Sequence, residues 1–221
     1  MTLLLLSILM KTVSAYNPTW STLKSSTAWE VQDTVQTEVG KVTVSKQLNG
    51  GFPCFAGHMI YPEQLDVSLM IEIAADAESA IDWSSAGIVH AKTLKRTDAF
   101  VDYWQYLNVP VFSDRMWFLR GYFEASGDVS VFRWERLEPS GEHRQFYEEK
   151  IKQYPHAEVT PINFGAWQIS NRGDTTSITY RICSHPGGSV PPMLQSVATE
   201  STLPNNLRDL VVETKKRMET Q

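Results

Sequence analysis

The 221-residue sequence has few of the residues that metal sites, disulfide scaffolds and nucleic-acid surfaces require. Its two cysteines, Cys54 and Cys183, cannot build a multi-cysteine metal centre or a disulfide framework. We predict two separate apolar core residues, with a disulfide as the alternative if the protein is exported. A net charge of −5 gives no footprint for nucleic acid, which needs clustered Lys and Arg. We expect no metal, no other cofactor and no nucleic-acid partner.

The sequence also lacks the common catalytic motifs. Its five histidines contain no HExxH or His-x-His spacing, and Ser189 in "GGSVP" does not match a nucleophile elbow. Isolated histidines such as His58 and His90 are typical of structural or surface positions. These absences predict that the protein is not an enzyme.

Long hydrophobic runs are absent after residue 15. The run from Leu3 to Met10 is too short to span a bilayer, and Val13-Ser14-Ala15 has the compact residues that signal peptidase prefers. Residues 1–15 are therefore predicted to be a signal peptide, with a hydrophobic extension or a start codon assigned too early as alternatives. A signal peptide implies a periplasmic or secreted protein, and its absence a cytoplasmic one. Residues 16–221 are predicted to form a single domain.

Aromatic residues are abundant, with seven Trp, eight Tyr and nine Phe. Large rings can line a broad surface or a cavity with few residues. The sequence pattern predicts an α+β domain with one antiparallel sheet and a helix at each end of the strand-rich region. The expected elements are a hairpin over 29–48, a strand over 54–61, a helix from Pro62 to about Asp82, strands over 87–96, 99–107, 115–125, 129–139, 157–170 and 176–183, and a final helix to about Met218, interrupted near Pro204. The charged stretch 140–154 is predicted to be a solvated loop with one helical turn.

Alternation within the strands separates two faces of the predicted sheet. In "FVDYWQY" one face holds Phe100, Asp102, Trp104 and Tyr106, while Tyr103 and Gln105 take the other; we expect the first face to point inward. An ordinary packed core and a lined cavity are both compatible with such a face. Asp102 is the exception on it, because a carboxylate on an apolar face costs several kcal/mol unless it is paired or hydrogen-bonded. It is expected to be neutralised, to bind a cation or to meet a polar ligand head, unless it lies at the strand's rim in water.

Five segments in order resemble the START (steroidogenic acute regulatory-related lipid transfer) domain, between Trp29 and Met218. They are "AWEVQDTVQTEVGKVTVSKQ", "HMIYPEQLDVSLMIEIAADAESAIDW", "YLNVPVFSDRMWFLRG", "FGAWQI" and "SHPGGSVPPMLQSV". The chain departs from the family pattern at Met116 and His185, where the family usually has Asp. Some members hold an acid and an Arg inside the cavity. Here Asp102 takes the acid position but Gly121 takes the Arg position, with Arg120 one residue away, which puts a buried ion pair in doubt.

The resemblance implies a helix-grip fold, in which a curved antiparallel sheet wraps around a long C-terminal helix and encloses a hydrophobic cavity. It implies that the protein binds a phospholipid or sterol and carries it between membranes through transient membrane contact, with the C-terminal helix and the loop 108–113 acting as a lid. A sensing module for a small apolar or aromatic ligand, and a helix-grip hydrolase or cyclase, are the alternatives. The residues predicted to line the cavity are Phe100, Asp102, Trp104, Tyr106, Trp117, Leu119, Phe123, Trp167, Ile178, Tyr180, Ile182, Leu194, Val197 and Ala198.

Overall fold

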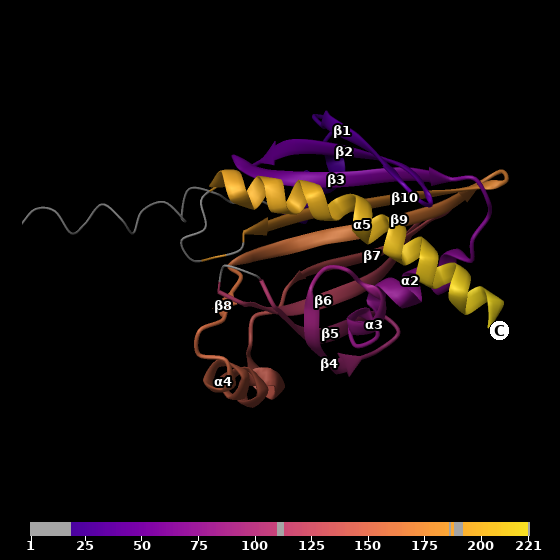
Figure 1. Ribbon diagram of the computed structural model, residues 1–221. Helices are drawn as coiled ribbons and strands as arrows, with labels where there is room; N and C mark the ends of the chain where they lie inside the picture. Colours follow the sequence, from indigo (N-terminus) through magenta and orange to yellow (C-terminus); the bar gives the residue numbers. More distant parts are fainter. Residues whose placement is uncertain (1–18, 110–112, 186, 188–191, 221) are drawn as a thin grey trace, which may run out of the picture.

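The computed structural model describes residues 19–109, 113–185, 187 and 192–220, without the side chains of 192–201. Within these residues one large sheet faces a long C-terminal helix (Figure 1). The strands are β1 (Glu30–Thr37), β2 (Gly40–Asn49), β3 (Phe52–Tyr61), β4 (Ile88–Arg96), β5 (Phe100–Leu107), β6 (Arg115–Ser126), β7 (Val129–Arg136), β8 (Glu158–Val159), β9 (Ile162–Arg172) and β10 (Thr175–His185). The helices are α1 (Trp20–Ser25), α2 (Val67–Ala75), α3 (Ala80–Trp83), α4 (Arg144–Gln153) and α5 (Pro192–Glu219), with a 3-10 turn, η2, at Gly141–His143. None of the described helices is long and apolar enough to cross a membrane.

The sheet runs in the order β1-β2-β3-β10-β9-β7-β6-β5-β4, and β8 pairs in parallel with the start of β6. Its main strands pair antiparallel, and the sheet is not closed, so β1 and β4 form its two edges. After β3 the chain crosses through α2 and α3 to the far edge, and then returns strand by strand until β10 pairs with β3. This is the predicted α+β helix-grip arrangement.

Consecutive predicted strands pair as antiparallel hairpins, and two of the turns follow from glycine. β6 and β7 are joined by Gly127-Asp128, and β9 and β10 by Gly173-Asp174. Gly127 has φ +60° and Gly173 has φ +59°, the left-handed values that two-residue hairpin turns need. These tight turns fix the register of both hairpins, so alternate residues of each strand reach the same face of the sheet.

The predicted helix from Pro62 begins later and is divided in two. Asp66 caps α2, because its carboxylate accepts a hydrogen bond of 3.0 Å from the backbone N–H of Leu69. Residues before Asp66 are tied to the sheet instead, since the N–H of Leu65 donates to Thr176 Oγ1 at 2.9 Å. The chain leaves the helix at Asp76 and forms the short α3 from Ala80.

Helix α5 is continuous through Pro204, where an interruption was expected. Figure 1 shows it as one coil that changes direction partway along the concave side of the sheet. The apolar residues Leu207, Leu210 and Val211 of the helix are fully buried, as is Leu203 one turn earlier. The helix approaches β3 closely at Gly57, where a Cβ atom would lie 2.9 Å from Leu207. The core therefore lies between α5, α2 and the sheet.

The two cysteines are bonded to each other, contrary to the prediction of two separate residues. Cys54 on β3 and Cys183 on β10 have Cα atoms 4.4 Å apart. The pairing of β3 with β10 places them on adjacent strands, which neither sequence spacing nor local pattern reveals. A small buried cluster that includes Leu23 of α1 and Phe164 of β9 covers the disulfide.

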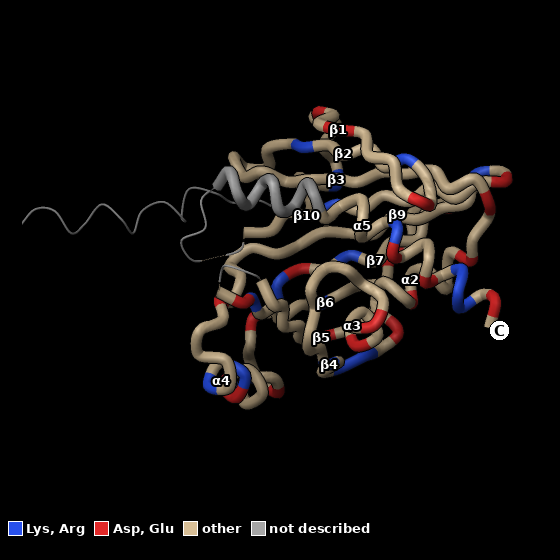
Figure 2. Tube along the Cα trace, in the orientation of Figure 1, with Lys and Arg blue, Asp and Glu red and all other residues tan. Residues whose placement is uncertain are grey.

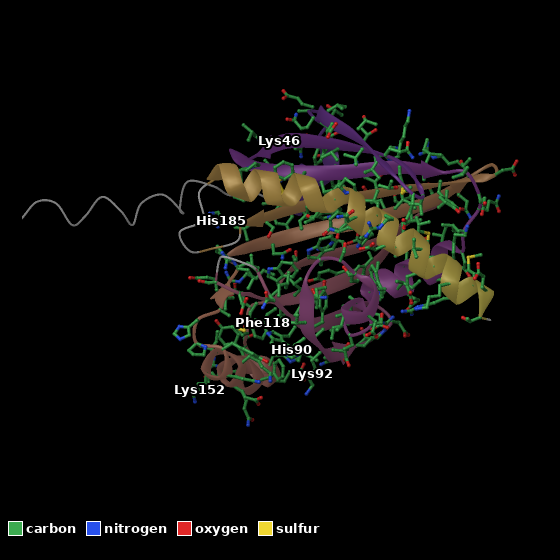
Figure 3. All side chains as sticks on the ribbon, in the orientation of Figure 1. Lys46, His90, Lys92, Phe118, Lys152 and His185 are labelled. Atoms are coloured by element: carbon green, nitrogen blue, oxygen red, sulfur yellow. A yellow bond between two sulfur atoms is a disulfide. The ribbon has the colours of Figure 1, made fainter. Side chains whose placement is uncertain are left out.

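The prediction of a solvated loop over 140–154 is wrong for most of this stretch, which forms helix α4. Most of its charged residues face water, while Phe146, Tyr147 and Ile151 pack onto the side of the sheet opposite α5. Figure 3 shows Phe118 of β6 beside this helix, where its ring centroid lies 4.7 Å from that of Tyr147. Because α4 covers β5 and β6, these two strands are buried on both faces.

Candidate functional site: an apolar cavity under the C-terminal helix

A cavity of ≈ 320 Å³ lies between the concave face of the sheet, α5 and the α2–α3 segment. Cavities of about 300–1,000 Å³ hold small ligands, so this one is at the lower end of that range. Aliphatic and aromatic side chains form most of its wall. The lining residues are Ala74, Ala77, Ala80, Trp83, Ser84, Ala86, Ile88, Tyr103, Gln105, Leu107, Val109, Arg115, Trp117, Leu119, Phe132, Trp134, Asn163, Trp167, Tyr180, Ile182, Ser184, Thr202, Leu203 and Asn206.

Five strands supply the floor of the cavity with alternate residues. β5 and β6 pair so that Tyr103 faces Leu119 and Gln105 faces Trp117. Cross-strand partners share a face of the sheet, so all four of these side chains point toward α5. Figure 2 shows that charged residues gather on α4 and at the C-terminal end of α5. The cavity wall is correspondingly poor in charge, with Arg115 as its one charged side chain among the described lining residues.

Aromatic rings stack along the floor. Tyr180 lies between two tryptophans, with ring centroids 5.4 Å from Trp134 and 4.3 Å from Trp167. The Trp134 indole lies over Gly165, where a Cβ atom would come within 2.6 Å of the ring. Its N–H donates to Asn163 Oδ1 at 2.9 Å, which anchors the stack at one end. The wall is thus a rigid aromatic surface suited to apolar groups.

Burial keeps the cavity's phenols neutral. Burial raises the pKa of Tyr103 and the pKa of Tyr180 above the usual range. The neighbouring Tyr180 raises the pKa of Tyr103 further through charge repulsion. A neutral phenol can donate or accept a hydrogen bond without adding charge to the site. Neither tyrosine therefore brings a nucleophilic phenolate to the cavity at ordinary pH.

Three buried polar atoms at the cavity have no hydrogen-bond partner. They are Arg115 Nε, Trp117 Nε1 and Asn206 Oδ1. Buried polar groups in folded proteins are nearly always paired, so each of these marks a place where something else can bind. In the described part of the chain no three His, Cys, Asp or Glu side chains converge as metal ligands do.

The structure brings five of the predicted cavity residues together. These are Trp117, Leu119, Trp167, Tyr180 and Ile182, on β6, β9 and β10. Phe123 and Ile178 belong to the hydrophobic core beside the cavity and do not form its wall, so their prediction is corrected. Leu194, Val197 and Ala198 lie outside the described side chains, and the lid loop is described only at its ends.

The predicted inward face of β5 is wrong. Phe100, Asp102, Trp104 and Tyr106 point to the convex side of the sheet. There α4 and η2 cover Asp102, Trp104 and Tyr106, and the Arg120 guanidinium lies over the Phe100 ring, 4.4 Å from its centroid. Trp104 packs edge-on against Phe146 of α4, with ring centroids 5.8 Å apart. Both faces of β5 carry aromatic residues and both are buried, so alternation alone could not tell the inner face from the outer. The inner face is Tyr103, Gln105 and Leu107.

Asp102 forms an ion pair on that convex side. Its carboxylate is fully buried and accepts two hydrogen bonds from Arg120, at 2.5 and 2.7 Å, and contacts His143 Nε2 at 2.9 Å. Burial opposes ionisation, but these hydrogen bonds outweigh it and lower the pKa of Asp102. The carboxylate is therefore paired within the protein, and is neither at a wet rim nor in the cavity. On the inner face of the sheet, the Phe132 ring occupies the space beside Gly121 and would lie 2.3 Å from a Cβ atom at that position.

Sequence reasoning missed several residues of the cavity. The most buried polar ones are Gln105, Arg115 and Asn163, which are 7%, 5% and 2% exposed. Arg115 begins the strand after the predicted lid loop, and a count of two residues back from Trp117 places it on the same face. This spacing from Trp117 was the sequence signal that could have identified Arg115 as a cavity residue. Nothing in the local sequence identifies Asn163 as a cavity residue. Its position depends on the hydrogen bond from the Trp134 indole on β7, which neighbours β9 in the sheet.

Comparisons with known proteins support this architecture. No protein-family profile matches the sequence, and no curated protein sequence matches it. Among solved structures, the chain is similar to a STAR-related lipid transfer protein fragment from Xanthomonas axonopodis, with 19% identity and a TM-score of 0.67 over 85% of this chain and 98% of that one. It is similar to human STARD10, with 13% identity and a TM-score of 0.68 over 89% of this chain and 76% of that one. A weaker likeness, at 12% identity and a TM-score of 0.50 over 75% and 94%, is to the Zhui aromatase/cyclase from Streptomyces sp. R1128. At these identities the likeness shows the fold, which is the helix-grip fold of START domains.

Proposed function

We propose that the protein binds one lipid in the cavity under α5 and carries it between membranes, without chemistry on the lipid. The observation that carries this proposal is the ≈ 320 Å³ cavity with an aromatic floor beside a well-packed hydrophobic core. Two similar structures are named as lipid transfer or STARD proteins, which supports the same reading for this chain. The volume favours a single chain or a compact ring system over two long acyl chains.

The energy of transfer explains why such a cavity is needed. Exposure of one methylene to water costs about 0.8 kcal/mol, so a sixteen-carbon chain costs roughly 12 kcal/mol to leave a bilayer. Burial against Trp167, Tyr180 and Leu119 offsets most of that cost, because these side chains already face an apolar space. The lipid therefore exchanges one dry environment for another, and the protein acts as a soluble carrier.

A carrier has to open at a membrane and close in water, and we assign that movement to α5 and the loop 108–113. The C-terminal half of α5 is tied to the segment after α3, where Asp209 accepts hydrogen bonds from the Ser85 N–H and hydroxyl at 2.8 and 2.6 Å. Arg217 further along donates to Ser79 Oγ at 3.1 Å. An opening movement that keeps these contacts moves the other half of the helix, with the bilayer favouring the open state.

The protein is also proposed to be exported. The Cys54–Cys183 disulfide requires an oxidising compartment to form and persist, and the short apolar segment before Tyr16 has the composition of a signal peptide. Two features far apart in the sequence thus agree. A periplasmic or secreted carrier serves membranes that face such a compartment.

Two other functions fit the same fold. A cyclase is favoured by the likeness to the Streptomyces enzyme, and a sensing module by a cavity that is small for a phospholipid. An enzyme of this kind would chemically change the molecule that it binds, whereas a sensor would hold its ligand without passing it on. The structures named as lipid transfer or STARD proteins have TM-scores of 0.67 and 0.68 against 0.50 for the cyclase, so the carrier is the better-supported proposal.

The test is transfer of labelled lipid between two vesicle populations. Donor vesicles carry a fluorescent fatty acid, lysophospholipid or sterol with a quencher, and acceptor vesicles carry none. Purified protein is expected to raise the rate of dequenching in proportion to its concentration. Uptake without delivery to acceptors supports the sensing module instead, and chemical change of the bound molecule supports the enzyme. A folded sample that takes up no lipid of any class contradicts the proposal.

A further inference from the structure

The guanidinium of Arg115 is buried at the cavity wall without an acidic partner. The residue is 5% exposed, and its Nη1 donates only to the backbone carbonyl oxygens of Ser113 and Asp114. Its Nε has no hydrogen-bond partner at all. Several other arginines in the described chain, such as Arg120 and Arg133, pair with a carboxylate, whereas Arg115 at the cavity does not. A buried charge that lacks such a partner is costly, so proteins seldom keep one without a use.

The two carboxylates nearest to Arg115 do not remove this charge. Asp114 accepts hydrogen bonds from the Tyr106 hydroxyl at 2.5 Å and from the Val109 N–H at 3.1 Å. Glu158 stands opposite Arg115 in the parallel β6–β8 pair and acts on it through charge attraction without a hydrogen bond. Both acids favour the charged form of Arg115, but burial prevails and lowers its pKa. The protein's own groups therefore compensate the desolvation of the guanidinium only in part.

A second unpaired donor lies on the same strand. The Trp117 indole N–H is buried without a partner, and Trp117 follows Arg115 by two residues, so both side chains face the cavity. Two residues along a strand span about 7 Å, the scale of one polar head with its first chain atoms. Both groups can only donate hydrogen bonds, so what completes them is an acceptor. An anionic oxygen group supplies several acceptors together with the missing negative charge.

We infer that the ligand of this cavity carries an anionic oxygen head, a carboxylate or a phosphate ester, which pairs with Arg115 and accepts a hydrogen bond from Trp117. The apolar part then lies along the aromatic floor formed by Trp134, Trp167 and Tyr180. This inference rests on the proposed function and narrows its ligand to acidic single-chain amphiphiles. The remaining unpaired atom, Asn206 Oδ1 on α5, can accept a hydrogen bond from a hydroxyl of the same ligand.

The first test compares head groups on one chain and needs no variant. Hexadecanoate, hexadecyl phosphate and hexadecanol are titrated separately, below their aggregation concentrations, by displacement of a fluorescent probe from the native protein. A hydrogen-bonded charge pair in a buried site is worth about 10- to 100-fold in affinity, so at least one anionic amphiphile is expected to bind that much more tightly than the alcohol. Inorganic phosphate and acetate, added alone at the same concentrations, are expected to displace nothing.

The second test removes the charge. Arg115→Met is expected to lower the affinity for the anionic amphiphile about 10- to 100-fold and to leave hexadecanol binding unchanged, while Arg115→Lys keeps part of the preference. Arg181→Met is the matched control. Arg181 also has a buried Nε without a partner, but it lies over the Trp29 ring, 5.7 Å from its centroid, and does not line the cavity. Its replacement is expected to keep the full preference.

The outcomes separate this inference from the proposed function. Equal affinity of the native protein for all three amphiphiles overturns the anionic head and leaves the carrier standing. Binding of none of them, and of no lysophospholipid or sterol, in a folded sample contradicts the carrier itself. If inorganic phosphate alone displaces the fluorescent probe as strongly as hexadecyl phosphate does, the anion bound by Arg115 is not a lipid head group and the inference is overturned. If Arg115→Met fails to fold, the native comparison and Arg115→Lys still decide.

Discussion

Replacement of Leu119 by Trp is expected to block lipid binding without harm to the fold. Leu119 is 3% exposed at the centre of β6, and its side chain forms part of the cavity wall opposite α5. Neighbouring backbone positions on β5 and β7 hold it in a fixed register. An indole at this position points into the ≈ 320 Å³ space that the lipid would occupy.

The size of the effect follows from the displaced chain. An indole in place of the Leu119 side chain excludes roughly three or four ligand methylenes, each worth about 0.8 kcal/mol. The loss of about 2.4–3.2 kcal/mol corresponds to a 50- to 200-fold weaker affinity, roughly. The empty protein is expected to be as stable as the native one or more so by about 1 kcal/mol, because the ring fills a void.

Both quantities are measured on the same sample, binding by fluorescent-lipid titration and stability by urea unfolding. Ile60→Trp is the control, because Ile60 is an aliphatic strand residue that is 60% exposed and does not line the cavity. It is expected to change neither quantity. If Leu119→Trp instead destabilises the fold by about 1–3 kcal/mol while lipid binding is unchanged, the interior is packed solid and the reasoning is refuted.

Three further changes have definite expected results. Asp102→Asn is expected to cost about 3 kcal/mol of unfolding free energy at neutral pH, because it leaves the Arg120 charge without its buried partner, and to leave lipid binding unchanged. Because the pKa of Asp102 is lowered in the fold, its ionised form stabilises the protein above about pH 4, and this stabilisation is lost as the pH falls through the lowered value. In urea unfolding between pH 6 and pH 3, the native protein is expected to lose stability on acidification by an amount that Asp102→Asn does not lose. The double replacement of Cys54 and Cys183 by Ala is expected to lower the unfolding free energy by about 2–5 kcal/mol, since the disulfide closes a loop of 129 residues, and a reductant is expected to do the same to the native protein alone. Mass spectrometry of the protein exported by its own cells is expected to find a mature chain that starts at Tyr16.

Each of these results can also contradict its premise. Lipid binding that falls with Asp102→Asn places that carboxylate at the ligand after all. Equal stability with and without a reductant indicates that the cysteines are unpaired in solution, which also removes the support for export. A purified chain that retains residues 1–15 leaves the protein unexported or anchored by that segment.

Most of the fold follows from local sequence. The hairpins depend on Gly-Asp turns and on β-branched and aromatic strands, and both signals act over a few residues. The apolar positions Leu207 and Leu210 likewise mark the buried side of α5 by helical spacing alone. What these signals do not contain is which strands meet across the chain, and the Cys54–Cys183 bond depends on that alone.

The inner face of β5 could not be predicted for a related reason. Alternation separates the faces of a strand but names neither as the inner one, and here Trp104 on one side and Tyr103 on the other are both buried. The decisive element is α4, whose charged sequence resembles a solvated loop although Phe146 packs on Trp104. Once α4 covers the convex side, Asp102 is enclosed there with Arg120, and the cavity falls to the other face.

Native mass spectrometry of the protein purified from its own cells tests most directly whether the space beneath α5 holds a lipid. We predict a complex with one bound amphiphile of a single chain or ring system and an acidic head, released when the sample is denatured. A protein that is wholly unliganded in that measurement, and stays so after incubation with vesicles, would contradict the assignment of this cavity as a lipid site.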